Sequence, residues 1–237
     1  MRRMGWGTAA ALAVAALGAA GPAAAQAVAP SARSARELLT QASFEDTNRD
    51  VAMRRVAQAH SVAGQALART PQDGDAALMQ ATALGYRAKL TGSRGDAVDA
   101  RRQFEALVAK SPRNSEAWLA LGAWHVGAVY KLGGLIGRTA VGARKAAGID
   151  ALDRAVALGG NRAFVTGLAA LLRLELDPAD PKGRALAEAT ARAATPTALD
   201  RILQRGAAAV LVAVRTGDAK LIRTRASRLL PFGQFGD

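Results

Sequence analysis

Half of the 237 residues are hydrophobic, and 32 Lys and Arg outnumber 19 Asp and Glu, so the formal net charge is +13 at pH 7. The absence of cysteine excludes disulfide bonds and a lipid-modified cysteine, and two histidines supply too few ligands for zinc, which takes about three or four N or S ligands. A chain of this length buries on the order of 70% of its surface, so it forms a core without a metal or cofactor.

Residues 1–25 have the order of a secretory signal peptide. Arg2 and Arg3 come first, an alanine- and leucine-rich stretch follows over residues 8–20, and small residues occupy positions 23–25. An uncleaved membrane anchor is the alternative, but alanine is weakly apolar and a spanning helix needs about 20 strongly apolar residues. We therefore expect an exported, soluble, periplasmic protein with no integral membrane span after signal cleavage.

Residues 26–34 form a polar, proline-containing lead-in, and residues 231–237 form a tail with glycine and proline. We predict both segments to be loose. Between them the chain is dominated by alanine, leucine, arginine and glutamate, and no stretch alternates apolar and polar residues as a strand does. The sequence therefore predicts an all-α protein.

Within the helical body, apolar residues recur at matching offsets before a proline that stops the helix. A further occurrence, Leu152 and Ala155 before Gly160, has no proline. Such spacing indicates repeated pairs of closely packed helices. The two proline-stopped units contain Ala59, Ala63 and Pro71, and then Ala100, Phe104 and Pro112.

A tryptophan-led helix follows the second of these prolines, and its signature residues are Trp118, Leu121, Gly122 and His125. This spacing resembles the tetratricopeptide repeat (TPR), although His125 stands where the TPR pattern prefers tyrosine. The resemblance covers residues 35–177 and implies an α-solenoid of antiparallel helix pairs, with an insert at residues 131–148. A tryptophan-led helix with a long insert is also similar to repeats of the regulator of microtubule dynamics group.

Residues 178–230 are predicted to continue as helices, separated by breaks at Pro196 and Gly217. They form either a further degenerate repeat or a capping segment, which a repeat array needs to cover its terminal apolar face. We predict the capping role. The expected helices span residues 182–193, 198–215 and 219–230.

In TPR proteins the first helix of each repeat lines the concave binding surface. The resemblance therefore implies a partner groove formed by Leu119, Ala123 and Val126, with Glu116 at its entrance. Helical spacing places the three apolar residues on one stripe, distinct from the stripe of Trp118. The alternative is that the insert or a neighbouring helix covers this stripe.

We predict no catalytic, cofactor-binding or metal site. His125 occupies a packing position, and no acid lies between Glu116 and Asp150 to orient it as a general base. The glycine-bearing insert fails as a phosphate-binding loop, because Leu132 stands where that motif needs glycine and Arg138 replaces its lysine. The acidic residues fall mostly at helix starts, where capping explains them.

Basic residues gather in two regions, the insert, which has no acid, and the C-terminal helices. A positive surface attracts acidic proteins or anionic envelope material. Nucleic acid is not expected, because the few aromatic residues are not interleaved with the arginines. The alternative is a solvated arginine-rich face. The predicted basic surface contains Arg201, Arg205, Arg215, Lys220, Arg223, Arg225 and Arg228.

These features together predict a noncatalytic adaptor or scaffold of the cell envelope that binds a protein or peptide. Two other functions stay open at this point. One is an accessory component of a transport system, which holds a solute or docks a solute-binding protein. The other is an enzyme with an unrecognised carboxylate or histidine site.

Overall fold

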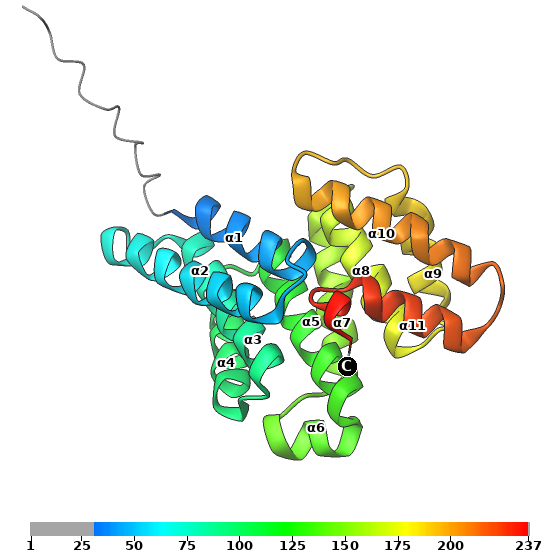
Figure 1. Ribbon diagram of the computed structural model, residues 1–237, viewed down its shortest axis with the longest axis horizontal. Helices are drawn as coiled ribbons and strands as arrows, with labels where there is room; N and C mark the ends of the chain where they lie inside the picture. The colour runs from blue at the N-terminus through cyan, green and yellow to red at the C-terminus, as the bar shows by residue number, and fades with distance from the viewer. Residues whose placement is uncertain (1–30, 237) are drawn as a thin grey trace, which may run out of the picture.

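The computed structural model describes residues 31–236, which form eleven α-helices and a short 3₁₀ helix, η1 (Gly233–Phe235) (Figure 1). These residues contain no strand, only an isolated bridge between Arg162 and Ala194. The prediction of an all-α fold is thus confirmed. The helices are α1 (Ala32–Phe44), α2 (Arg49–Arg69), α3 (Gly74–Thr91), α4 (Arg94–Lys110), α5 (Ser115–Leu132), α6 (Gly134–Val141), α7 (Lys145–Gly159), α8 (Ala163–Leu176), α9 (Pro181–Thr190), α10 (Ala198–Val214) and α11 (Ala219–Leu229).

Neighbouring helices pack against one another in chain order, as in a helical repeat array. The pairs are α1 with α2, α3 with α4, α5 with α7, α8 with α9, and α10 with α11. Short polar connections separate them, and the side chain at the start of most helices accepts a hydrogen bond from the first turn. Such caps are formed by Asn48, Asp73, Ser93, Asn114, Asp180 and Asp218.

The closest helix pair is built on glycine. A Cβ atom at Gly122 of α5 would lie 2.8 Å from the Leu152 side chain and 3.0 Å from its backbone nitrogen on α7. Further along the same pair, a Cβ atom at Gly148 would lie 3.0 Å from Val126. The repeat signature at position 122 therefore corresponds to a close approach of the two helices.

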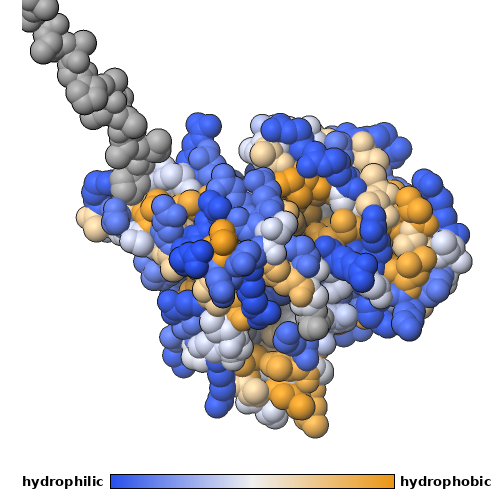
Figure 2. All heavy atoms as spheres, in the orientation of Figure 1, coloured by the Kyte–Doolittle hydropathy of each residue, from blue (hydrophilic) through white to orange (hydrophobic). Residues whose placement is uncertain are grey.

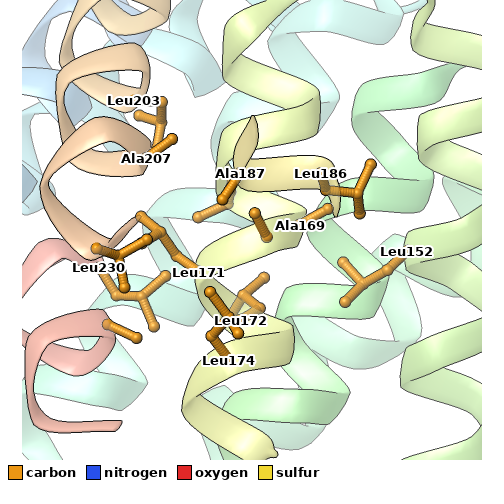
Figure 3. Close-up of a cluster of buried hydrophobic side chains, with 14 of the residues drawn as sticks. Leu152, Ala169, Leu171, Leu172, Leu174, Leu186, Ala187, Leu203, Ala207 and Leu230 are labelled. Carbon is orange, nitrogen blue, oxygen red and sulfur yellow. The ribbon is translucent and has the colours of Figure 1, made fainter. Parts of the chain in front are cut away.

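Two buried clusters share α5 as their boundary. The first joins α7 to α11 through leucines such as Leu152, Leu171 and Leu203 (Figure 3). The second joins α1 to α5 and includes Val56 and Phe104. Trp118 packs against both clusters. Since this tryptophan links them, the two halves of the array share one continuous interior.

The structure shows the conformation of the insert, for which the sequence predicted neither loop nor helix, and it differs from the sequence prediction at both ends. The insert, residues 131–148, is mostly helical, because it contains the end of α5, all of α6 and the start of α7. Helix α1 begins inside the predicted lead-in, where Ser31 and Ser34 form a capping box. Residues 231–236 are folded onto the helices. The predicted signal peptide, residues 1–25, lies outside the described residues.

No single helix between residues 31 and 236 is both long enough and apolar enough to span a membrane. Helices α5 and α6 meet the length and composition required only as a pair, and the chain bends by 119° between them.

Candidate binding groove

The first helices of four pairs, together with part of α4, face a shared groove of about 730 Å³. Helices α1, α3, α5 and α8 line it, and α11 with the C-terminal segment borders its other side. Figure 2 shows this face hollowed between α1 and α10, with hydrophobic side chains inside the hollow. The groove therefore lies where helical repeat proteins present their binding surface.

The groove has an apolar interior and a basic rim. Its interior is formed by aromatic and aliphatic side chains, including Leu78, Phe104, Leu119, Trp124, Phe164 and Leu172. The charged residues around it are mainly cations: Arg36, Arg49, Lys89, Arg94, Lys131 and Arg228, with the acids Glu116 and Glu175. Such a site favours an apolar ligand that carries negative charge.

The structure places three of the four predicted groove residues on this surface. Glu116 and Ala123 line it and are partly exposed, whereas Leu119 borders it but is only 1% exposed. Val126 is fully buried and does not line the groove, so that assignment was wrong. The reason is the close approach of α7 at Gly148, which covers this part of α5.

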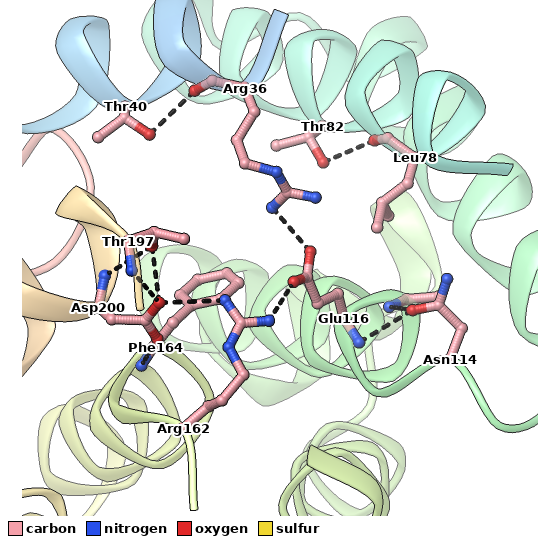
Figure 4. A network of polar contacts seen from close by, with 11 residues as sticks. Arg36, Thr40, Leu78, Thr82, Asn114, Glu116, Arg162, Phe164, Thr197 and Asp200 are labelled. Carbon is pink, nitrogen blue, oxygen red and sulfur yellow. Dashed lines mark hydrogen bonds and ion pairs between the residues drawn. The ribbon is translucent and has the colours of Figure 1, made fainter. Parts of the chain in front are cut away.

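Glu116 is the centre of a charged network that crosses the groove (Figure 4). Its carboxylate accepts from Arg36 of α1 at 2.7 Å and from Arg162 at the start of α8 at 2.8 Å. Arg162 also reaches Asp200 of α10 at 3.2 Å. The network joins four helices that are distant in sequence. The residue predicted to anchor a partner therefore also holds the two sides of the groove together.

Asp200 is fully buried, and its hydrogen bonds explain why a charge is tolerated there. Burial alone would raise its pKa, but hydrogen bonds from Thr197, the Phe164 N–H and Arg162 outweigh burial and lower the pKa. The Thr197 hydroxyl donates at 2.6 Å and the Phe164 N–H at 2.9 Å. Asp200 is thus a fixed anion that orients Arg162.

The C-terminal segment 231–236, predicted to be loose, packs into one side of the groove. Phe232 is buried and donates its N–H to the Ser43 carbonyl of α1 at 2.9 Å. The Pro231 carbonyl accepts from Lys89 of α3 at 2.8 Å. The tail therefore joins the end of the chain to its first two helix pairs.

The backbone at this turn is specialised. Phe232 has φ 64°, the only non-glycine residue between 31 and 236 in the left-handed region. A Cβ atom at Gly233 would lie 2.2 Å from the Ser227 carbonyl oxygen, so only glycine fits there. The burial of Phe232 offsets the backbone strain. Two phenylalanines within a tail that has no other apolar residue but proline were the sequence signal that the prediction of a loose tail overlooked.

His125 is buried, and its Nδ1 accepts a hydrogen bond from the Arg144 N–H at 3.3 Å. Burial, followed by the charges of Arg101 and Arg144, lowers its pKa to about 4. The ring is therefore neutral at pH 7 and packs edge-on against Trp124, with centroids 5.0 Å apart. This environment corresponds to the packing role that the TPR resemblance implied.

The other signature residues fall into two groups. The apolar ones, Ala59, Ala63, Ala100, Phe104 and Leu121, are buried between helices. The prolines, Pro71 and Pro112, are exposed in the connections after α2 and α4. The Pro112 carbonyl accepts from the Trp118 indole at 2.8 Å, which ties the connection to the helix that follows.

The predicted basic residues of the C-terminal helices are all exposed but do not face one common site. Arg228 lies at the groove rim, whereas Arg215 borders a separate cavity of about 400 Å³ beside Glu188. Arg223 donates to the Glu175 carbonyl of α8 at 3.2 Å. Arg201, Arg205, Lys220 and Arg225 line neither cavity.

A separate buried cation, Arg173, forms ion pairs that link α8 to α7 and to the start of α9. Arg173 of α8 is 5% exposed and pairs with Asp180 at 2.7 Å and with Asp153 of α7. Burial opposes ionisation of both acids, but their hydrogen bonds to cations dominate and lower the pKa of each. No group of three His, Asp or Glu side chains among residues 31–236 is placed to hold a metal ion.

No protein-family model matches the chain, and comparison with curated proteins gives no match. The functional interpretation therefore depends on the groove itself.

Proposed function

We propose that the protein is a noncatalytic, TPR-like interaction module of the cell envelope, whose groove binds an apolar segment of a protein partner. The predicted signal peptide supports the compartment, and the succession of helix pairs supports the repeat resemblance. Recognition along a helical concavity, rather than bond chemistry, is the mechanism.

The observation that carries this proposal is that the protein's own tail packs along one side of the groove and forms part of its wall. Phe232 packs among the apolar side chains of the second core cluster, and Phe235 packs against the same cluster. The Phe232 N–H of the tail also donates a hydrogen bond to the Ser43 carbonyl of α1. A short aromatic peptide segment is thus a chemically suitable occupant of this surface.

The rim adds a preference for acidic residues near that segment. Six cations and two acids are among the residues that line the groove. Because Glu116 is already paired with two arginines, it does not repel an acidic partner as a free carboxylate would. A peptide with aromatic or aliphatic anchors and flanking acids fits both properties.

Photocrosslinking tests this proposal. A benzophenone amino acid placed at Ala123, which lines the groove, is expected to crosslink one defined protein in envelope extract. The matched control is Ala208 of α10, which is exposed and lines neither cavity. Equal crosslinking from both positions, or crosslinking only from Ala208, would reject the groove as the binding site.

Ala123→Arg supplies the complementary loss of function. The arginine projects into the groove and is expected to abolish capture of the crosslinked partner, with helical content and melting temperature close to wild type. Capture should survive a wash at about 1 M salt, where charges are screened within roughly 3 Å. Partner material that the salt removes from wild type and variant alike would assign binding to the basic surface instead.

A second candidate function is the holding of a small apolar solute for a transport system. The groove volume of about 730 Å³ favours it, because small-molecule sites span about 300–1,000 Å³. Mass spectrometry of the protein purified without detergent distinguishes the two functions. A single co-purifying solute that is absent from Ala123→Arg supports the solute carrier, and its absence from wild type supports the peptide groove.

A further inference from the structure

Helix α6 carries a compact apolar surface at the foot of the molecule (Figures 1 and 2). Leu135 is 78% exposed and Ile136 is 58% exposed, and Leu132 before them is also exposed. These three residues are half of the strongly exposed large hydrophobic side chains between residues 31 and 236. Leu135 and Ile136 do not line the groove, whereas Leu132 does, so this surface adjoins the end of the groove and extends outside it.

The helix is held firmly on its opposite side. Gly137 and Val141 are buried, and the Ala140 carbonyl accepts from Arg94 of α4 at 2.7 Å. Gly142, in the left-handed region with φ 78°, ends the helix and returns the chain to α7. Since the inner side is fixed, the outer apolar side chains are presented to solvent in a defined position rather than on a loose loop.

The charged residues in this stretch of the chain are all cations. Arg138 lies on α6 itself, and Arg144 and Lys145 follow it, all three exposed. No Asp or Glu occurs between Glu116 and Asp150. An exposed apolar helix face flanked by Lys and Arg is the chemistry that inserts at the boundary of an anionic bilayer.

We propose that α6 docks the protein onto an anionic membrane surface, with Leu135 and Ile136 inserted among the acyl chains and the neighbouring cations on the lipid headgroups. A bilayer fits this surface better than a protein partner does, because protein hot spots are enriched in Trp, Tyr and Arg and depleted in Leu.

A fluorescent probe at one position of the full chain tests this directly. The sequence has no cysteine, so Leu135→Cys offers a single attachment site for an environment-sensitive dye. Val212→Cys, 62% exposed on α10, is the matched control. With vesicles of phosphatidylcholine and phosphatidylglycerol, the emission at position 135 should shift to the blue and that at position 212 should not.

The charge contribution is measured by vesicle composition. Each Lys or Arg near an anionic surface changes partitioning about fivefold, so Arg138→Gln with Lys145→Gln should weaken the response at position 135 by about 30-fold. Pure phosphatidylcholine vesicles should give a much weaker response than the anionic ones. An equal response with both lipids would overturn the proposal.

The position-specific signal also separates α6 from every other membrane-binding segment. If the chain sediments with anionic vesicles while the probe at position 135 does not shift, another segment binds the lipid and the proposal is wrong. The proposal is equally wrong if the chain does not sediment with the vesicles and the probe emission does not shift. Circular dichroism of each variant verifies that the fold is retained.

Discussion

The ring of Tyr86 in α3 meets the ring of Phe232 in the tail edge to face, with centroids 4.9 Å apart and an interplanar angle of 86°. The contact joins residues from the second helix pair and the end of the chain. Burial raises the pKa of Tyr86 to about 12. This tyrosine therefore reports whether the tail is in place.

Phe232→Ala should release the tail from the groove. Loss of a buried phenylalanine costs about 3–5 kcal/mol of packing, and the alanine keeps the left-handed strain. We expect the pKa of Tyr86 to fall from about 12 towards its ordinary value of 10. Ultraviolet absorbance of the tyrosinate during a rapid alkaline titration measures the shift.

Phe235→Ala is the control for that experiment. Phe235 is partly buried and stacks on Phe232 with centroids 6.2 Å apart, but it has no ring contact with Tyr86. A small change in the Tyr86 pKa is expected. A wild-type pKa in Phe232→Ala would show that the tail does not bury this tyrosine.

Gly122→Ala should destabilise the protein by about 1–3 kcal/mol, because the new methyl group meets both the side chain and the backbone of Leu152. Gly127→Ala on the same helix is the matched control, since a Cβ atom there has no neighbour within 4 Å. Removal of a mid-helix glycine should stabilise by about 0.5–1 kcal/mol. Urea unfolding of both variants measures the two effects. The interpretation of α5 and α7 as a close pair fails if the two substitutions have the same sign.

Stability should depend on pH through His125. Its pKa is about 4 in the fold and 6.5 as the ordinary value, so the unfolded chain binds more protons between these values. The contribution is complete above pH 6.5 and is lost as pH falls towards 4, on the order of 3 kcal/mol. Urea midpoints across this window should fall for wild type and change less for His125→Asn, which keeps an acceptor for the Arg144 N–H. If the urea midpoint depended on pH in the same way in both proteins, the assignment of a neutral, buried His125 would be contradicted.

Asp200 titrates in a lower window. Its pKa in the fold is below the ordinary 3.8, so its stabilisation is present above that value and is lost as pH falls below it. Asp200→Asn should therefore reduce the further loss of stability in strong acid. It should not change how steeply stability falls with pH between pH 6.5 and 4. Acid titration followed by circular dichroism separates the two residues.

Glu116→Ala tests whether the charged network holds the groove. The substitution removes the shared acceptor of Arg36 and Arg162, which are both partly buried, and should cost about 1–3 kcal/mol. The control is Glu37→Ala. Glu37 and Arg33 form an exposed i, i+4 ion pair on α1, and such pairs contribute little to stability. Equal thermal stability of the two variants would refute the structural role of Glu116.

Several helices were predictable because their signals are local. Helices α10 and α11 begin at the predicted residues and each end one residue earlier than predicted. Helix bounds depend on hydrophobic periodicity and on glycine and proline breaks, which all act within a few helical turns. The role of Gly122 in close helix packing was also predictable, because two helices can approach closely only where one of them has a small residue.

The groove was only partly predictable. Helical spacing placed Ala123 and Val126 on one stripe of α5, but the approach of α7 buries Val126 and leaves Ala123 at the groove. Spacing identifies a face of a helix and does not identify what covers it. The same limit applies to Glu116, whose two arginine partners come from segments remote in the sequence.

The sequence by itself determined the all-α class, the order of the helices and their small-residue contacts, because these depend on interactions within a few residues or between adjacent helices. Only the tertiary structure decided that Phe232 returns to α1 and α3, that Arg36 meets Glu116, and that Leu135 is left exposed. These depend on the curvature of the whole array, which accumulates from many helix crossings.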